Sequence, residues 1–380
     1  MRRPAVWRGS RKRNPYRMHV ATASRPLRYT IPHKLTEFGY GYPKELIAAY
    51  PAEPREAARL MVVHRETGEI EHRSIADLPE YFNAGDVLVA NDTQVFPARM
   101  LGAKEKTGAS VEVFLLRELN AETRLWDVIV EPARKVRVGN KICFAEDLSA
   151  EVIDNTTSRG RTIRFMFDDT PEALYALIDR IGNTPIPRYI RRDTEPEDKA
   201  RYQTVFAQHR GAVAAPAAGL HFTSKLIKLL TKKGVDIAPV TLHTGLGTFR
   251  AVEVEDLTKH RMDSENYVIS SESVEIVNRA LTSREHTVTV CSTTTVRALE
   301  SCISADHTLK ADAGWTDKFI FPPYKFKITE RLLTNFQMPR SPLFIMVSAF
   351  GGVDLIRYAY QEAFKKKYRL FAFGDAMLII

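Results

Sequence analysis

The sequence is poor in cysteine and has no long apolar run. Its 380 residues include three cysteines, Cys143, Cys291 and Cys302, which lack the CxxC spacing or histidine partners of a zinc site or disulfide framework. We therefore expect three buried, reduced thiols and no metal. No segment approaches the roughly 18 apolar residues that cross a bilayer, and the N-terminus lacks the apolar stretch of a secretory signal. These absences predict a soluble, cytoplasmic protein without a membrane partner.

Acidic residues are absent from the first 36 positions. Of the 55 lysines and arginines, ten precede the first acid, Glu37, which leaves 45 basic against 46 acidic residues in the rest of the chain. The net charge of +9 is therefore a property of residues 1–36, which we expect to form a basic, disordered extension. The alternatives are an RNA-binding arm, an organelle-targeting presequence, or sequence ahead of a true start at Met18. Any RNA-binding surface in the body must be a local patch.

Two kinds of secondary structure follow each other along the chain. Short strands recur about every ten residues in the first part, which favours a small barrel or sandwich. These expected strands are residues 60–63, 86–89, 110–116, 126–130 and 162–167. Helices and strands alternate from Pro171 onward, which indicates an α/β domain. The chain exceeds the roughly 250 residues of a single core, so we expect an α/β catalytic domain of residues 37–60 and 169–380, interrupted by a β domain of residues 61–168.

Local signals place individual elements in the α/β part. Thr223 is expected to cap a helix that carries Leu226, Ile227, Leu229 and Leu230 on one face and ends at Gly234. Residues 240–242 and 288–290 are expected strands, and helices are expected to open at Ser270 or Ser271 and to cover residues 296–303. Residues 42–48 are helix-like and precede the β region, which is why we treat the β domain as an insertion.

Three blocks of small and polar residues are candidates for a ligand site. Residues 214–223, AAPAAGLHFT, place small side chains ahead of His221 and a helix cap, where a helix N-terminus can receive an anion. The alternative is a tightly packed loop in which His221 is satisfied internally. Residues 241–249, TLHTGLGTF, follow a strand end, where α/β sheets place ligands, but they lack the third glycine of a dinucleotide fingerprint.

The third block, residues 291–300, CSTTTVRALE, is a strand-to-helix turn rich in hydroxyl groups. Arg297 and Glu300 lie three residues apart on one helix face, so they predict either a structural ion pair or a polar clamp for a ligand carboxylate or ribose. Residues 260–265 combine a histidine with acids, which could support proton transfer or form a solvated loop. The sequence contains no HExxH, Walker or GxSxG motif, which removes support for metal hydrolysis, phosphoryl transfer and serine hydrolysis.

The densest basic patch of the body interleaves arginine and lysine with tyrosine. Aromatic rings near basic residues suit single-stranded RNA, whose bases can be stacked, although neighbouring acids dilute the patch. Its members are Arg188, Tyr189, Arg191, Arg192, Lys199, Arg201 and Tyr202.

Taken together and in order, these segments resemble the S-adenosylmethionine:tRNA ribosyltransferase-isomerase family of queuosine biosynthesis. The resemblance runs from about Tyr40 to the C-terminus and includes the three blocks above. Its other motifs are YPKELIA at 42–48, NDT at 91–93, PAR at 97–99, RYQT at 201–204, TD at 316–317, FPPYKF at 321–326, TNF at 334–336, VSAF at 347–350 and GDAML at 374–378.

The resemblance implies a fold and a reaction. The fold is α/β, with an open, barrel-like α/β main domain that carries an inserted small β-barrel domain. The enzyme would be a monomer that moves and isomerises the ribosyl part of S-adenosylmethionine onto 7-aminomethyl-7-deazaguanine at the wobble position in a tRNA anticodon loop. Epoxyqueuosine-tRNA would form, and adenine and methionine would leave.

Site residues follow from this resemblance and from the chemistry. A sulfonium acidifies its neighbouring carbon, so a base can start the reaction, and His221, His243 and Glu265 are the candidates for proton transfer. Phe222, Phe249 or Tyr202 could hold the sulfonium over an aromatic face. The turn at residues 293–295, together with Arg297, could take the methionine carboxylate. The expected substrate-binding residues are Phe222, Thr223, Gly245, Gly247, Thr248, Phe249, Thr293, Thr294, Thr295, Arg297, Glu300, Asn335 and Phe336. The expected tRNA contacts are Arg188, Arg191, Arg201, Tyr202 and Gln203.

Five positions depart from the family pattern. Ala217 stands where threonine is usual, Ser292 replaces glycine, Gln337 and Asp263 each replace histidine, and Pro342 replaces threonine. Gln337 matters most, because an amide cannot shuttle protons as imidazole does. The alternatives are therefore a catalytically impaired tRNA-binding relative, or an S-adenosylmethionine enzyme that acts on a small molecule.

Overall fold

The computed structural model describes residues 34–245, 252–283 and 285–380, all of which belong to one compact unit. Nearly all of the expected N-terminal extension lies outside the described residues. Its last residues are described: the backbone of Lys34 forms an antiparallel β-bridge with that of Asp256, and Leu35–Phe38 forms a 3-10 helix that buries Leu35 and Phe38.

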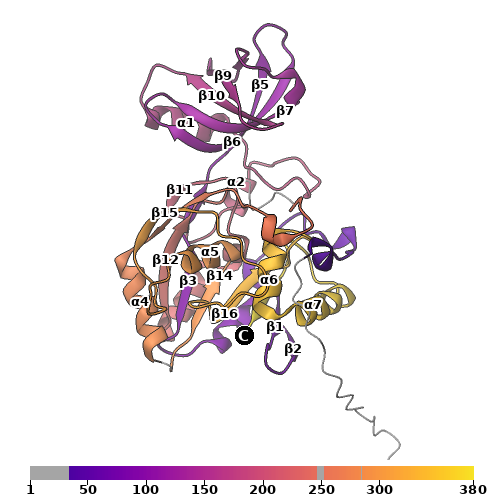
Figure 1. The fold of residues 1–380 in the computed structure, drawn as a ribbon, viewed down its shortest axis with the longest axis vertical. Coiled ribbons are helices and arrows are strands. Elements are labelled where there is room, and N and C mark those ends of the chain that lie inside the picture. The colour runs from indigo at the N-terminus through magenta and orange to yellow at the C-terminus, as the bar shows by residue number, and fades with distance from the viewer. Residues whose placement is uncertain (1–33, 246–251, 284) are drawn as a thin grey trace, which may run out of the picture. The chain divides into compact units, whose positions relative to one another are not determined.

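A nine-stranded mixed sheet organises the larger part of the protein (Figure 1). Its central strands β12, β3, β14 and β16 are parallel, and the pairs toward both edges are antiparallel except β17 with β1. In spatial order the strands are β15 (Asp312–Thr316), β13 (Glu265–Ile269), β12 (Asp236–Leu242), β3 (Val87–Asn91), β14 (Val288–Cys291), β16 (Arg331–Asn335), β17 (Ala376–Ile379), β1 (Arg59–Val63) and β2 (Ile70–Ser74).

Helices cover both faces of this sheet. Val87 and Val89 of β3 pack in one core with the helices α4 (Ser271–Ser283), α5 (Thr293–Ser301), α6 (Pro342–Gly351) and α7 (Val353–Lys365). Leu88 and Ala90 point to the other face and pack with α3 (Ser224–Lys232) and the 3-10 helix η4 (Ile75–Tyr81). Because successive side chains of a strand alternate between faces, β3 must be apolar throughout to serve both cores.

Six antiparallel strands close into a small barrel with a core of its own. They are β10 (Gly160–Met166), β7 (Leu125–Glu131), β6 (Ser110–Asn120), β5 (Arg99–Lys104), β8 (Lys141–Cys143) and β9 (Ser149–Asn155), in spatial order. Trp126, Val128 and Val130 of β7 point inward with period two. The helix α1 (Pro171–Ile181) packs on this core through Leu174 and Ile178. The expected α/β fold with an inserted small barrel is confirmed.

The expected boundaries of the inserted domain are wrong at their N-terminal side. Residues 60–63 and 86–89 are strands, as expected, but they belong to β1 and β3 of the large sheet, and the barrel begins at β5. The pattern of short strands could not separate the two, because β1 pairs with β17, more than 300 residues further along the chain.

Two smaller expectations are also corrected. Residues 42–48 contain only one 3-10 turn, Lys44–Leu46, because Pro43 precedes it and Ile47 is extended and bridges to Leu370. Cys143 is exposed on the short strand β8, whereas Cys291 and Cys302 are buried.

The helix expected after Thr223 is confirmed: the Thr223 hydroxyl accepts a hydrogen bond from the backbone N–H of Leu226 at 3.2 Å.

The remaining described elements are short. The strands β4 (Thr93–Val95) and β11 (His209–Ala212) pair in parallel as a separate two-stranded sheet. The helix α2 (Asp198–Arg201) and the 3-10 helices η3 (Arg55–Ala57), η5 (Ala133–Lys135), η6 (Ala217–His221) and η8 (Leu257–Lys259) occupy the connections. No single helix in the described ranges is long and apolar enough to cross a membrane, and only α6 and α7 together, bent by 111°, meet that length and composition.

Candidate functional site

A pocket lies where the central strands of the sheet end. Residues just beyond β12 and β14 and at the end of β16 line it, which is the edge where open α/β sheets bind ligands. Its cavity volume is about 100 Å³. The lining residues are Tyr189, Tyr202, Ala215, Ala217, Ala218, Thr244, Ser292, Thr293, Thr294, Thr334, Asn335, Phe336, Gln337, Met338, Pro339, Ser341, Leu343, Phe371 and Ala372. None of these residues carries a charge.

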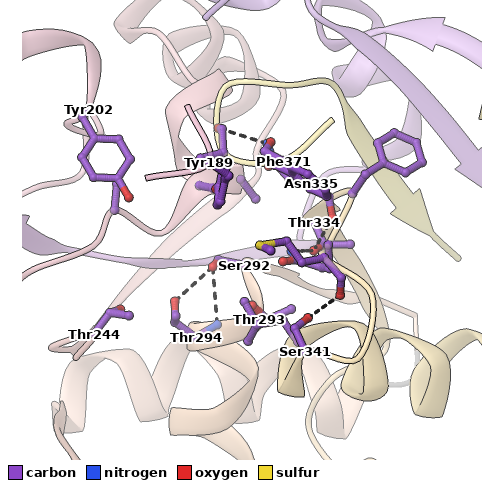
Figure 2. Close-up of a pocket in the computed structure, with 18 of the residues that line it drawn as sticks. Tyr189, Tyr202, Thr244, Ser292, Thr293, Thr294, Thr334, Asn335, Ser341 and Phe371 are labelled. Atoms are coloured by element: carbon purple, nitrogen blue, oxygen red, sulfur yellow. Dashed lines mark hydrogen bonds between the residues drawn. The ribbon is translucent and has the colours of Figure 1, made fainter. Parts of the chain in front are cut away.

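The start of α5 forms a polar side of the pocket (Figure 2). The Ser292 hydroxyl caps the helix by accepting a bond from the backbone N–H of Thr294. The Asn91 side-chain amide donates to the Thr294 hydroxyl at 3.1 Å and to the Leu242 carbonyl at 3.0 Å, which ties β3, β12 and α5 together. Ser292 has a φ of +85°, a conformation that favours glycine, so the glycine usual in the family has a structural reason here.

Aromatic rings form the opposite side of the pocket. Tyr189 and Phe371 meet edge to face with ring centroids 5.1 Å apart, and Figure 2 shows both rings with Asn335 across the pocket from Ser292. Tyr202 and Phe336 also line the pocket. Burial raises the pKa of the Tyr189 and Tyr202 hydroxyls well above their usual value, so both rings are neutral at physiological pH.

His221 lies behind this pocket and does not line it. Its Nε2 is 3.3 Å from Oδ1 of Asn335, whose amide nitrogen donates to the carbonyls of Phe371 and Ala372. Burial lowers the pKa of His221 to about 4, so the ring is neutral near pH 7 and its Nε2–H donates to Asn335. His221 therefore holds the pocket residue Asn335 in place. This arrangement agrees with the alternative from the sequence, in which His221 is hydrogen-bonded within the protein.

Glu265 and Arg297 form a fully buried ion pair. The Arg297 Nη1 contacts Oε2 of Glu265, and the two side chains are 0% and 2% exposed. Oε1 of Glu265 accepts the backbone N–H of Gly245 at 2.8 Å, so the pair anchors the segment that follows β12. Arg297 also donates to the carbonyls of Lys318 and Thr316. Neither residue lines the pocket.

Glu300 does not pair with Arg297. Its carboxylate accepts the backbone N–H groups of Lys327, Ile328 and Thr329 and the hydroxyl of Tyr324. Of the two interpretations that the sequence left open, the Arg297–Glu300 ion pair is therefore wrong: a partner 32 residues away in sequence pairs with Arg297, and a loop satisfies Glu300.

His243 occupies a partly exposed position beside the strand pair β4 and β11. Its Nδ1 lies 2.8 Å from the Thr93 hydroxyl, and burial lowers its pKa. The ring packs on Gly211, where a Cβ atom would come within 2.6 Å of it. His243 does not line the pocket, whereas its neighbour Thr244 does.

The other expected substrate-binding residues divide into three groups. Thr293, Thr294, Asn335 and Phe336 line the pocket, as does Tyr202, which was expected to contact tRNA. Thr223 caps α3, Phe222 is buried against Phe206 with ring centroids 5.2 Å apart, and the Thr295 hydroxyl donates to the Cys291 carbonyl. Gly247, Thr248 and Phe249 lie outside the described residues.

Sequence reasoning missed several pocket residues, chiefly Tyr189 and Phe371 of the aromatic side. Tyr189 stood in the basic patch and Phe371 in no recognised block, so no local signal pointed to their meeting.

Three of the positions that depart from the family pattern, Ala217, Ser292 and Gln337, line the pocket. A fourth, Pro342, occupies the first position of α6, which suits proline because no backbone N–H is needed there.

The residues expected to contact tRNA differ in their exposure and in how far their side chains are already bonded within the protein. Gln203 is bonded to the backbone of Val95 through both ends of its amide, and Arg201 pairs with Glu195 at 2.6 Å. Arg188 pairs with Glu112 and Glu131 but remains about half exposed, and Arg191 is exposed. These two arginines line a groove together with Arg99 and Arg192. Among the described residues no group of three or more His, Cys, Asp or Glu side chains could hold a metal ion.

Comparison with known proteins gives one consistent result. A sequence model of the family described as "Queuosine biosynthesis protein" matches residues 35–379. Proteins named S-adenosylmethionine:tRNA ribosyltransferase-isomerase from Cytophaga hutchinsonii and Flavobacterium psychrophilum are 58% and 56% identical, over 91% of this chain and 100% of theirs. The crystal structure of the S-adenosylmethionine tRNA ribosyltransferase from Thermotoga maritima is similar with a TM-score of 0.51 and 36% identity, over 90% of this chain and 100% of that one. This chain therefore belongs to the queuosine biosynthesis protein family, with the S-adenosylmethionine:tRNA ribosyltransferase-isomerases.

Proposed function

We propose that this chain is an S-adenosylmethionine:tRNA ribosyltransferase-isomerase. It transfers and isomerises the ribosyl part of S-adenosylmethionine onto 7-aminomethyl-7-deazaguanine at the tRNA wobble position, and adenine and methionine leave. The observation that carries this proposal is an uncharged pocket with aromatic and hydroxyl-rich sides, in a chain 58% identical over 91% of its length to a protein of that name. Neither the impaired relative nor the small-molecule enzyme has comparable support.

The pocket suits a sulfonium substrate. Aromatic faces attract a cation through their quadrupole, and Tyr189, Tyr202 and Phe371 supply such faces without a competing positive charge. S-adenosylmethionine would enter as a co-substrate, and the reaction as proposed needs no metal. The target base belongs to a single-stranded loop, so presenting it costs less than extraction from a duplex.

None of the three candidates for proton transfer lines the pocket, and we choose His243, the neighbour of the pocket residue Thr244, because the other two are engaged. His221 is engaged by Asn335 and Glu265 by Arg297, whereas the Nε2 of His243 has no hydrogen bond to any residue that the structure describes. Its lowered pKa keeps the imidazole neutral near pH 7 and therefore able to accept a proton.

The anticodon loop would be bound at the arginine-lined groove. Arg191 is exposed, so its guanidinium is available to backbone phosphates, which supply most of the affinity for RNA. Arg188 is about half exposed but pairs with Glu112 and Glu131, so it would have to exchange these carboxylates for phosphates. A monomeric, cytoplasmic enzyme remains our prediction, which size-exclusion chromatography with light scattering and cell fractionation would test.

The decisive experiment follows adenine release. The protein is incubated with S-adenosylmethionine and tRNA carrying 7-aminomethyl-7-deazaguanine, and adenine is quantified by chromatography. We expect release that depends on that base, with none from tRNA carrying guanine at the same position. A folded protein that releases no adenine would contradict the proposal, and equal turnover of the free base would favour a small-molecule enzyme.

A further inference from the structure

The hydroxyl groups of Thr244 and Thr293 differ from the other serine and threonine hydroxyls of the pocket, because neither bonds to a described residue. Ser292 and Thr294 bond to each other, Thr334 donates to the Asn335 carbonyl, and Ser341 donates to the Met338 carbonyl. The Thr244 hydroxyl is buried, with the residue 1% exposed, and it has no hydrogen-bond partner among the residues that the structure describes.

The position of Thr244 is fixed by its backbone. Its carbonyl accepts the N–H of Val213 at 3.0 Å. Two residues earlier, the Leu242 carbonyl accepts a hydrogen bond from the Asn91 side chain, which also donates to the Thr294 hydroxyl at the start of α5. Thr244 therefore borders the same pocket as the first turn of α5, as Figure 2 shows with Thr293 and Thr294. The hydroxyl of Thr293 likewise bonds to no described residue.

Among the residues that the structure describes, none offers a side-chain cation to this corner of the pocket. Arg297, which lies on α5, directs its guanidinium to Glu265, Thr316 and Lys318. The donors that remain there among the described residues are neutral. They are the two threonine hydroxyls and the first backbone N–H groups of α5 other than that of Thr294, which the Ser292 hydroxyl already accepts. A helix N-terminus carries a partial positive charge and favours an anion.

We propose that the Thr244 hydroxyl and the first turn of α5 bind the methionine carboxylate of S-adenosylmethionine. This inference rests on the proposed function. The carboxylate supplies the acceptor that the buried Thr244 hydroxyl lacks, and hydrogen bonds to an ionised acceptor are stronger than neutral ones. Thr244 is thus a specificity residue that distinguishes S-adenosylmethionine from analogues without the carboxylate.

The test replaces Thr244 with valine, which keeps the shape and removes the hydroxyl. The KM for S-adenosylmethionine is measured by adenine release at saturating tRNA, and decarboxylated S-adenosylmethionine, which retains the sulfonium, serves as competing ligand. We expect Thr244→Val to raise the KM about tenfold or more, and the Ki of the decarboxylated analogue to change less than about twofold. Thr244→Ser, which keeps the hydroxyl, should stay near wild type.

Thr289→Val is the matched control. The Thr289 hydroxyl is also buried and unpartnered among the described residues, but Thr289 does not line the pocket, so its KM should not change. An unchanged KM in Thr244→Val, or an equal loss for both ligands, would overturn the inference. If the valine variant does not fold, Thr244→Ala compared with Thr244→Ser gives the same contrast. Failure of the wild-type protein to release adenine would instead count against the proposed function.

Discussion

The buried pair Glu265–Arg297 gives the sharpest prediction about stability. Both side chains are almost completely inaccessible, and Glu265 is the one carboxylate among the described residues that pairs with the guanidinium, whose other bonds go to two backbone carbonyls. Glu265→Gln keeps the shape and can still accept the Gly245 N–H, but it leaves a positive charge buried without a counter-ion. Breaking a buried pair by removing one partner costs about 3 to 5 kcal/mol, so we expect a loss of that size.

Urea unfolding followed by circular dichroism measures this loss. The control is Asp236→Asn, because Asp236 and Arg279 form an ion pair at 2.9 Å in which both side chains are about half exposed or more. Exposed pairs contribute about 0 to 1 kcal/mol, so the control should unfold close to wild type. The midpoint of Glu265→Gln should fall with an unchanged dependence on urea concentration.

One outcome would refute this reasoning about Glu265. If Glu265→Gln unfolds within about 1 kcal/mol of wild type but releases no adenine, the carboxylate acts in proton transfer and the buried pair is not its main role. Reduced stability together with residual turnover at low temperature would support the anchoring role described here.

Three further predictions concern single groups. Burial lowers the pKa of His221 from 6.5 to about 4, so as the pH falls the unfolded chain binds a proton at His221 before the folded protein does, and the free energy of unfolding decreases below about pH 6.5. His221→Gln should remove this contribution, which is up to about 1.4 kcal/mol per pH unit, as measured by urea unfolding at several pH values down to pH 4. Arg191→Glu should weaken tRNA binding and lower its salt dependence in filter-binding assays, and an unaltered affinity would exclude the groove. A thiol reagent should label Cys143 rapidly in the native protein, with Cys291 and Cys302 reacting only on unfolding; prompt labelling of all three would contradict the described burial.

Local physical signals in the sequence determined much of the fold. Thr223 caps its helix, and the strand expected at 86–89 is β3 (Val87–Asn91), because hydrogen bonding at a helix start and a short apolar run involve only neighbouring residues. The order of the motifs determined the family for the same reason, since it depends on the chain alone. The polar start of α5 was also visible in its run of threonines.

Contacts between distant segments decided the rest. Whether a strand belongs to the barrel or to the large sheet depends on its partner, and β1 finds its partner β17 at the opposite end of the chain. The same holds for the site: Arg297 is neutralised by Glu265 and His221 is engaged by Asn335, so residues with suitable chemistry for catalysis are held as supports. Thr244, Tyr189 and Phe371 became pocket residues only through packing, because burial and hydrogen-bond satisfaction are properties of the assembled neighbours and not of the residue type.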